Sequence, residues 1–232
     1  MSDNNWITLS NPTRQINLAL EDKAKTLADK LVSEAEKHEP EVTKDLIDIT
    51  KGTPATVSYD QKDDAGVVHN SLDFRLKQRG SMANKLKEDS DFDVNKLGNK
   101  PIYDALRYTA LVKNPEMLVK SYHAIMLNLE KRGYNIMRVK NTINNYTLAR
   151  AYRGINTVIA DKSGYKFELQ FHTPQTLAVK EENHILYKKI SSKNSAAENL
   201  KINEQMFKNS QKIKDIPGGG TIESFDKLGG NK

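Results

Sequence analysis

Apolar residues recur at helical spacing near the start of the chain. The helical face expected from about residue 14 to residue 37 consists of Leu20, Ala24, Leu27, Leu31 and Ala35. Pro40 is expected to open a second helix that runs through Thr50, because proline suits the first turn of a helix. Similar spacing predicts a helix over 115–132 and two more after Pro174, with a break near 191–195.

Short apolar and alternating runs between these helices predict strands. They lie at 71–77, 107–112, 135–140, 154–160 and 165–171, and the last two should form a hairpin across the turn at 161–164. Side chains alternate along a strand, so the last strand has an apolar face and a polar face. Its polar face consists of Lys166, Glu168, Gln170 and His172. Such a face is typical either of an ordinary amphipathic strand or of the wall of a cleft.

The order of these elements predicts an α+β fold in which a mixed sheet is flanked by helices. We expect N-terminal helices and a connecting loop over 1–70, packed on a core that spans 71–190. A C-terminal helix should cover 191–216. Clustered glycines at 218–220 and 229–230 predict a flexible tail over 217–232.

Composition narrows the classes of function. The chain has 232 residues, a formal net charge of +6 and no cysteine. The charge favours anionic partners, and the missing cysteine excludes disulfides, thiolate metal sites and a cysteine nucleophile. The apolar runs are too short for a membrane span, and no signal-peptide pattern opens the chain. We therefore expect action in the cytoplasm, or delivery to it by a route without a cleavable signal peptide.

Common nucleotide and hydrolase motifs are missing from the sequence. It has no Gly-x-x-x-x-Gly-Lys-Ser/Thr loop, no Gly-x-Gly-x-x-Gly after a strand, no His-Glu-x-x-His and no Gly-x-Ser-x-Gly. A basic element is present instead, with Arg75 and Lys77 on one strand face, Ser81 at the expected start of a helix, and Lys85 one turn later. Two cations that face a helix N-terminus suit a polyphosphate, although a solvated basic strand end would have the same residues.

Four motifs in order resemble the synthetase domain of the RelA/SpoT alarmone family. They are Arg75-x-Lys77-x-x-x-Ser81, Asp104 before a short apolar strand, Tyr152-Arg153-Gly154-Ile155-Asn156-Thr157, and Glu168-Leu169-Gln170. Each motif is weak alone, but their order and spacing match over 74–188, about half of the chain. The variants Asp104–Thr109, Glu168–Thr173 and His184-x-x-Tyr187 are most similar to the compact synthetases of bacterial effector toxins. The resemblance implies a nucleotidyltransferase-like fold.

The resemblance also implies a reaction, in which the β,γ-pyrophosphate of ATP moves to the 3′-hydroxyl of a purine nucleotide. Arg75 would stack on or clamp the donor adenine, and its phosphates would lie against Lys77, Ser81 and Lys85. Asp104 and Glu168 would hold Mg²⁺, and Glu168, helped by Gln170, would orient or deprotonate the acceptor hydroxyl. Contacts to the acceptor are implied for Tyr152, by base stacking, and for Asn156, Arg107, His172 and His184.

Departures from the family lie on the acceptor side. Arg150-Ala151 replaces a frequent Asn-Gly, Asn156 replaces a frequent histidine, and His172 replaces a basic residue. The acceptor base therefore stays open between adenine (ADP, ATP) and guanine (GDP, GTP). Alternatives are pyrophosphate transfer to tRNA or another RNA 3′ end, a non-catalytic nucleotide-binding module, and, with low weight, an ADP-ribosyltransferase. The effector versions imply a growth-inhibiting toxin with a cognate immunity protein as its partner.

Overall fold

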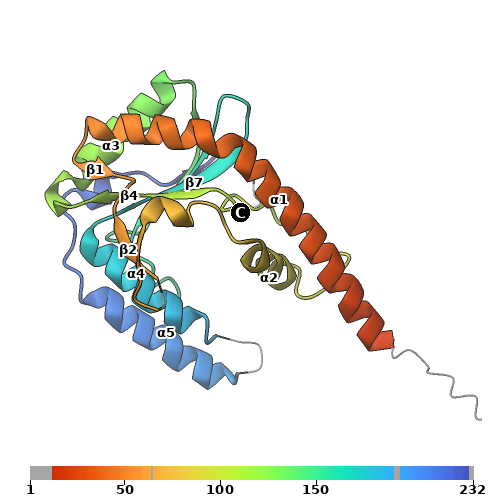
Figure 1. Ribbon diagram of the computed structural model, residues 1–232. Helices are drawn as coiled ribbons and strands as arrows, with labels where there is room; N and C mark the ends of the chain where they lie inside the picture. Colours follow the sequence, from red (N-terminus) through yellow and green to blue (C-terminus); the bar gives the residue numbers. More distant parts are fainter. Residues whose placement is uncertain (1–11, 64, 191–193, 230–232) are drawn as a thin grey trace, which may run out of the picture.

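A mixed sheet with helices on both faces forms the body of the computed structural model, which describes residues 12–63, 65–190 and 194–229 (Figure 1). The helices are α1 (Pro12–Lys51), α2 (Arg79–Asp89), α3 (Leu118–Lys131), α4 (Pro174–Tyr187) and α5 (Ala196–Gln211). Short 3₁₀ helices are η1 (Ser71–Phe74), η2 (Pro115–Met117) and η3 (Gly219–Thr221). The predicted α+β class with a mixed sheet is confirmed.

The main sheet has six strands in the order β1-β4-β7-β6-β5-β8. These are β1 (Ala55–Thr56), β4 (Arg107–Val112), β5 (Asn135–Asn141), β6 (Ile155–Ala160), β7 (Lys166–His172) and β8 (Phe225–Asp226). Strand β4 pairs parallel with β7, whereas the other neighbours pair antiparallel. A separate hairpin consists of β2 (Asp60–Lys62) and β3 (Val68–Asn70). The predicted hairpin of β6 and β7 is confirmed.

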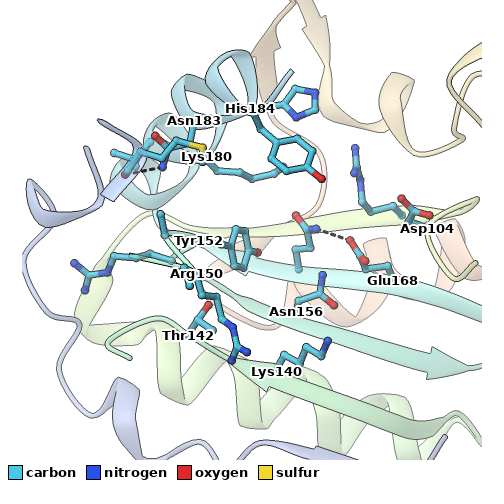
Figure 2. A pocket seen from close by; sticks show the side chains of 18 of the residues that line it. Asp104, Lys140, Thr142, Arg150, Tyr152, Asn156, Glu168, Lys180, Asn183 and His184 are labelled. Carbon is cyan, nitrogen blue, oxygen red and sulfur yellow. Dashed lines mark hydrogen bonds between the residues drawn. The ribbon is translucent and has the colours of Figure 1, made fainter. Parts of the chain in front are cut away.

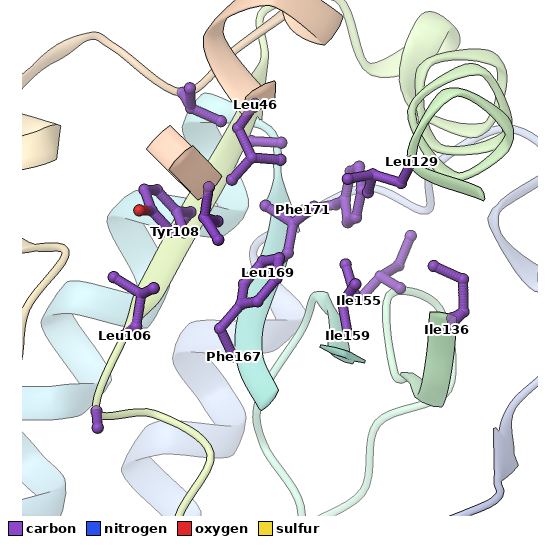
Figure 3. Close-up of a cluster of buried hydrophobic side chains, with 14 of the residues drawn as sticks. Leu46, Leu106, Tyr108, Leu129, Ile136, Ile155, Ile159, Phe167, Leu169 and Phe171 are labelled. Atoms are coloured by element: carbon purple, nitrogen blue, oxygen red, sulfur yellow. The ribbon is translucent and has the colours of Figure 1, made fainter. Parts of the chain in front are cut away.

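The hydrophobic core lies between one face of this sheet and the helices α1 and α3 (Figures 1 and 3). Phe167, Leu169 and Phe171 alternate along β7 and are each 0% exposed. Leu46 of α1 and Leu129 of α3 are equally buried against them (Figure 3). Since the apolar side chains of β7 fill this layer, its polar side chains must point to the opposite face of the sheet.

Helix α1 is continuous, and the prediction of two helices separated at Pro40 is wrong. A proline inside a helix removes one backbone hydrogen bond and costs about 3 kcal/mol. Ala35 and Val42, on either side of Pro40, are both buried in the same core, and this burial offsets the cost. Figure 1 shows α1 changing direction along its length, which is the bend expected of an internal proline.

Unlike the flexible tail expected over 217–232, the segment 217–229 packs on the core and pairs with the sheet; residues 230–232 lie outside the described residues. Ile216 and Ile222 are buried in the main core, and Phe225 pairs with Val139 in the sheet. Gly219 makes this close packing feasible, because a Cβ there would lie 2.7 Å from Ile143 Cγ2. Apolar residues between the glycines thus add a sixth strand.

The segment predicted as a strand over 71–77 is extended only in its second half. Asn70 Oδ1 accepts a hydrogen bond from the Leu72 amide at 2.9 Å and starts η1. Leu76 then forms an isolated bridge with Leu106, and the Lys77 amide donates to Ala105 O at 2.9 Å. Lys77 is thereby fixed beside the loop that leads into β4.

Among the described residues, none of the helices combines the length and the apolar character needed to cross a lipid bilayer.

Candidate active site

Two rows of side chains cross the face of the sheet that is opposite the core. The register places Arg107, Glu168, Val158 and Arg138 in one row across β4, β7, β6 and β5. The next row consists of Thr109, Gln170, Asn156 and Lys140. Neighbouring strands lie about 4.8 Å apart, so cations flank Glu168 one strand away on one side and two strands away on the other.

A cavity of about 620 Å³ lies over these rows, under the 149–153 loop and the facing sides of α4 and α5 (Figure 2). Its lining brings together six of the residues that the sequence predicted for the site: Asp104, Arg107, Tyr152, Asn156, Glu168 and Gln170. The predicted residue His184 also lines it, from α4. The volume is in the usual range of small-molecule sites and suits a nucleotide.

Several buried polar atoms in this cavity have no hydrogen-bond partner. Four such side-chain atoms occur in the described part of the chain: Ser121 Oγ, Arg138 Nε, Asn156 Oδ1 and Gln170 Oε1. The last three belong to residues that line the cavity. Buried polar atoms in folded proteins are nearly always paired, so a cluster of unpaired ones indicates a place for a polar ligand.

Asp104 is held by two of the predicted phosphate ligands. Lys77 Nζ lies 3.0 Å from Asp104 Oδ2, and Lys85 Nζ lies 3.1 Å from each carboxylate oxygen. Burial raises the pKa of Asp104, but the two lysines outweigh it and hold this pKa below its ordinary value. Asp104 is therefore ionised, and it faces the same cavity as Glu168 (Figure 2).

Arg75 and Ser81 were also predicted to contact the ATP donor, but they lie outside the group formed by Asp104, Lys77 and Lys85. Arg75 Nε donates to Glu39 Oε1 of α1 at 2.5 Å, and its terminal nitrogen donates to Leu72 O. Ser81 is exposed within the first turn of α2 and does not cap it, because the helix begins at Arg79 with Gln78 as its N-cap. Arg79, the first residue of α2, is paired with Glu36 and Asp29 of α1.

The side chain of Tyr152 is held in place by His172. Its hydroxyl lies 2.9 Å from His172 Nε2, and His172 Nδ1 lies 3.0 Å from Thr176 Oγ1 in the capping box of α4. Gly154 makes room for this arrangement, because a Cβ there would lie 2.5 Å from the Tyr152 hydroxyl and 2.6 Å from His172 Cε1.

His172 is buried and does not line the cavity, unlike the acceptor contact that the resemblance implied. Burial, reinforced by Lys180 and Arg107, lowers the pKa of His172 well below its ordinary value, so the ring is neutral. Burial, reinforced by the charge of Glu168, raises the pKa of Tyr152, so its hydroxyl stays protonated. His172 therefore orients Tyr152.

A second cavity, of about 450 Å³, adjoins the first. It lies between the β2–β3 hairpin, Phe74 of η1 and the outer side of α4, and it shares Arg107, Lys180 and His184 with the first cavity. The Arg107 backbone amide donates to Arg75 O at 2.7 Å, but within the described part of the chain the Arg107 side chain has no hydrogen bond or ion pair. Two basic side chains, Arg107 and Lys180, thus form a cationic wall between the two cavities, which favours anionic ligands in both.

Lys180 is a site residue that the sequence reasoning missed. Its side chain is only 20% exposed, and its Nζ lies 3.2 Å from Glu181 Oε1. Burial, together with the charge of Arg107, lowers the pKa of Lys180. The available signal was its spacing, because Lys180 and His184 are one helical turn apart and share a face of α4.

This arrangement of sheet and helices is the fold of the small alarmone synthetases, as the RelA/SpoT resemblance predicted. Small alarmone synthetase 2 from Bacillus subtilis superposes with a TM-score of 0.50 at 13% identity, over 81% of this chain and 90% of that chain.

Two further solved structures align at lower TM-scores. Small alarmone synthetase 1 from Bacillus subtilis bound to its product pppGpp gives a TM-score of 0.49 at 14% identity, covering 78% of this chain and 86% of that one. The Type VI effector Tas1 in complex with its immunity protein gives 0.45 at 16% identity, covering 80% and 96%. No protein-family model matches the sequence, and no curated protein matches it significantly.

Proposed function

We propose that this protein is an ATP-dependent pyrophosphokinase that transfers the β,γ-pyrophosphate of ATP to the 3′-hydroxyl of a purine nucleotide. The observation that carries the proposal is the pair of carboxylates, Asp104 and Glu168, that face one nucleotide-sized cavity among cations. The alarmone synthetase fold supports the same reaction class. Pyrophosphoryl transfer depends mainly on positioning and charge neutralisation, which this arrangement supplies.

The acceptor nucleotide would occupy the first cavity. Its base would stack on Tyr152, and its 5′-phosphates would lie toward Arg138 and Lys140 at the β5 end of the two rows. These cations lie away from Asp104, so the acceptor's 3′-hydroxyl would point back toward Glu168. A stacking contact accepts any base, which leaves adenine and guanine acceptors open.

The ATP donor would enter from the second cavity. Arg107 and Phe74 would contact its adenine there. Its phosphates would reach beyond this cavity to Lys77 and Lys85, which lie at Asp104, and to the first turn of α2. Arg75 would join the adenine by exchanging its bond to Glu39 for the ligand. The β-phosphorus would then lie at the cationic wall between the cavities, next to the acceptor hydroxyl.

In the transfer step, the 3′-oxygen of the acceptor attacks the β-phosphorus of ATP. A bond forms between these two atoms, the bond from the β-phosphorus to the α,β-bridging oxygen breaks, and AMP leaves with that oxygen. Glu168 takes the proton of the attacking hydroxyl, and the Gln170 amide, which donates to Glu168, holds the carboxylate in place. Lys180 would stabilise the charge on the moving pyrophosphate.

Asp104 and Glu168 would also hold Mg²⁺. Among the described residues, no group of three or more histidine, cysteine, aspartate or glutamate side chains could hold a metal alone. Two carboxylates nevertheless fit this ion, which usually takes one or two of them together with waters and substrate phosphates. When bound, Mg²⁺ would neutralise charge on the ATP phosphates.

A product screen tests the proposal. The protein is incubated with ATP, Mg²⁺ and each of ADP, ATP, GDP and GTP, and products are identified by mass spectrometry. We expect AMP and an acceptor that has gained a pyrophosphate. Glu168→Gln should lose at least about 100-fold in rate, whereas Glu182→Gln, an exposed change on α4, should keep the wild-type rate. Equal behaviour of wild type and Glu168→Gln with every acceptor contradicts the proposal.

An RNA 3′ end is the second candidate acceptor. The cations Arg138, Lys140 and Arg150 line the acceptor cavity and would also suit an RNA backbone. Labelled tRNA incubated with ATP should then gain the mass of a pyrophosphate, and no gain removes this candidate.

A growth-inhibiting effector role, with a cognate immunity protein, predicts that expression in bacteria arrests growth and that Glu168→Gln relieves the arrest.

A further inference from the structure

Two side-chain amides in the acceptor cavity offer oxygen atoms that nothing in the protein satisfies. Asn156 Oδ1 and Gln170 Oε1 are buried and unpaired in the described part of the chain. The orientation of the Gln170 amide follows from chemistry, because its nitrogen must face the Glu168 carboxylate, which accepts its hydrogen bond. Gln170 Oε1 is therefore left over as an acceptor, and a hydroxyl of a bound ligand can supply the donor.

The two amides lie next to each other and beside Glu168. Asn156 and Gln170 are directly opposite in the antiparallel pair of β6 and β7, which places their Cβ atoms about 5 Å apart. Glu168 points to the same face of β7, two residues and about 7 Å away. In Figure 2, Asn156 lies beside the Glu168 carboxylate on the cavity floor. A ligand with hydroxyls on adjacent carbons could contact both amides and the carboxylate.

We infer that Asn156 and Gln170 form a subsite for the 2′-hydroxyl of the acceptor ribose. This inference rests on the proposed function, in which Glu168 holds the neighbouring 3′-hydroxyl. The 2′-hydroxyl donates its single proton to the two unpaired amide oxygens in a bifurcated hydrogen bond. The acceptor should then be a ribonucleotide, because a 2′-deoxyribonucleotide leaves the two buried amide oxygens without a donor from the ligand.

Such a subsite should discriminate strongly between ribonucleotide and 2′-deoxyribonucleotide acceptors. A pocket built to hydrogen-bond a hydroxyl rejects an analogue that lacks it, because its own buried polar groups lose their partner. We expect wild-type protein to prefer ADP over dADP, and GDP over dGDP, by at least about 10-fold in kcat/KM. All four nucleotides have the 3′-hydroxyl that attacks ATP, so a difference in rate reports on the 2′-hydroxyl alone.

Variants at Asn156 test the subsite. Asn156→Ala should lower kcat/KM for the ribonucleotide by about 10-fold and change the deoxyribonucleotide rate little, so that the preference largely disappears. Asn156→Asp keeps acceptor oxygens of similar size and should keep the preference. Lys140→Met is the matched control, since Lys140 is the neighbour of Asn156 in the same row and should affect both acceptors equally.

The outcomes separate the two claims. Absence of product with every ribonucleotide and RNA acceptor removes the proposed function. Turnover with equal rates for ribose and deoxyribose acceptors overturns the subsite while the function stands. Equal losses for both acceptors in Asn156→Ala also overturn it and indicate that the amides hold a metal or the phosphates. Should Asn156→Ala fail to fold, the wild-type preference and its persistence in Asn156→Asp decide the question.

Discussion

Adding one methyl group at position 154 tests how the acceptor side of the site is built. A Cβ at Gly154 would lie 2.5 Å from the Tyr152 hydroxyl, 2.7 Å from Tyr152 Cζ and 2.6 Å from His172 Cε1. None of these atoms can move freely, because His172 is 0% exposed and its other ring nitrogen contacts Thr176. Gly154→Ala therefore forces Tyr152 and His172 apart.

The expected cost has two parts. Overpacking a filled site costs about 1–3 kcal/mol, and loss of the bond from Tyr152 to His172 leaves buried polar atoms unpaired at a further cost of about 1–3 kcal/mol. Together they predict a loss of about 2–6 kcal/mol in the free energy of unfolding. Tyr152→Leu removes two of the three nearest atoms, so in that background Gly154→Ala should cost at least about 1 kcal/mol less.

Urea unfolding followed by circular dichroism measures these differences, with an expected fall of about 1–2 M in the midpoint for Gly154→Ala. Gly80→Ala is the control, because its Cβ would meet nothing within 4 Å and alanine favours a helix. A midpoint for Gly154→Ala equal to that of wild type refutes the account of Tyr152 and His172. The account is also refuted if Gly154→Ala lowers the free energy of unfolding by the same amount in the Tyr152→Leu background as in wild type.

Three further predictions concern charged groups. Because Lys77 and Lys85 hold the pKa of Asp104 below 3.8, its contribution to stability is complete above that pH and is lost as pH falls through the lowered pKa. Asp104→Asn should therefore be less stable than wild type at neutral pH, and melting curves should converge below pH 3.8; a constant gap contradicts this. The lowered pKa of Lys180 predicts that Lys180→Arg shifts the alkaline limb of the activity profile to higher pH, and an unmoved limb would show that Lys180 does not contact the transferred group. Arg153 is buried and donates to Ile143 O and Ile213 O, each at 2.6 Å, so Arg153→Met should cost about 3–5 kcal/mol and speed proteolysis near the C-terminus, unlike Arg150→Met.

The sheet that carries the site could be predicted from the sequence because its strands have strong local patterns. Strands β4, β6 and β7 begin and end within one or two residues of their expected bounds. Alternation along β7 correctly separated its core face from the face that carries Glu168 and Gln170. Motif order then indicated that Asp104 and Tyr152 join this face, and both line the cavity.

Other features depend on contacts between distant segments, which local patterns do not encode. Pro40 is a helix-start signal, yet tertiary burial on both sides keeps α1 continuous. Glycines near the C-terminus predicted flexibility, whereas the residues between them pair with β5. The engagement of Arg75 by Glu39 joins residues that are 36 positions apart, and burial of Lys180 follows from how α4 packs over the sheet.

The central claim is that pyrophosphate moves as one unit to a nucleotide hydroxyl with Glu168 at the reacting atoms. ATP labelled in its β-phosphate, incubated with Mg²⁺ and the best acceptor, tests this claim most directly by mass spectrometry. The account predicts labelled, pyrophosphorylated acceptor and unlabelled AMP in equal amounts, and formation of both at least about 100-fold more slowly in Glu168→Gln. Label that remains in ADP, or product formation by Glu168→Gln at the wild-type rate, would contradict it.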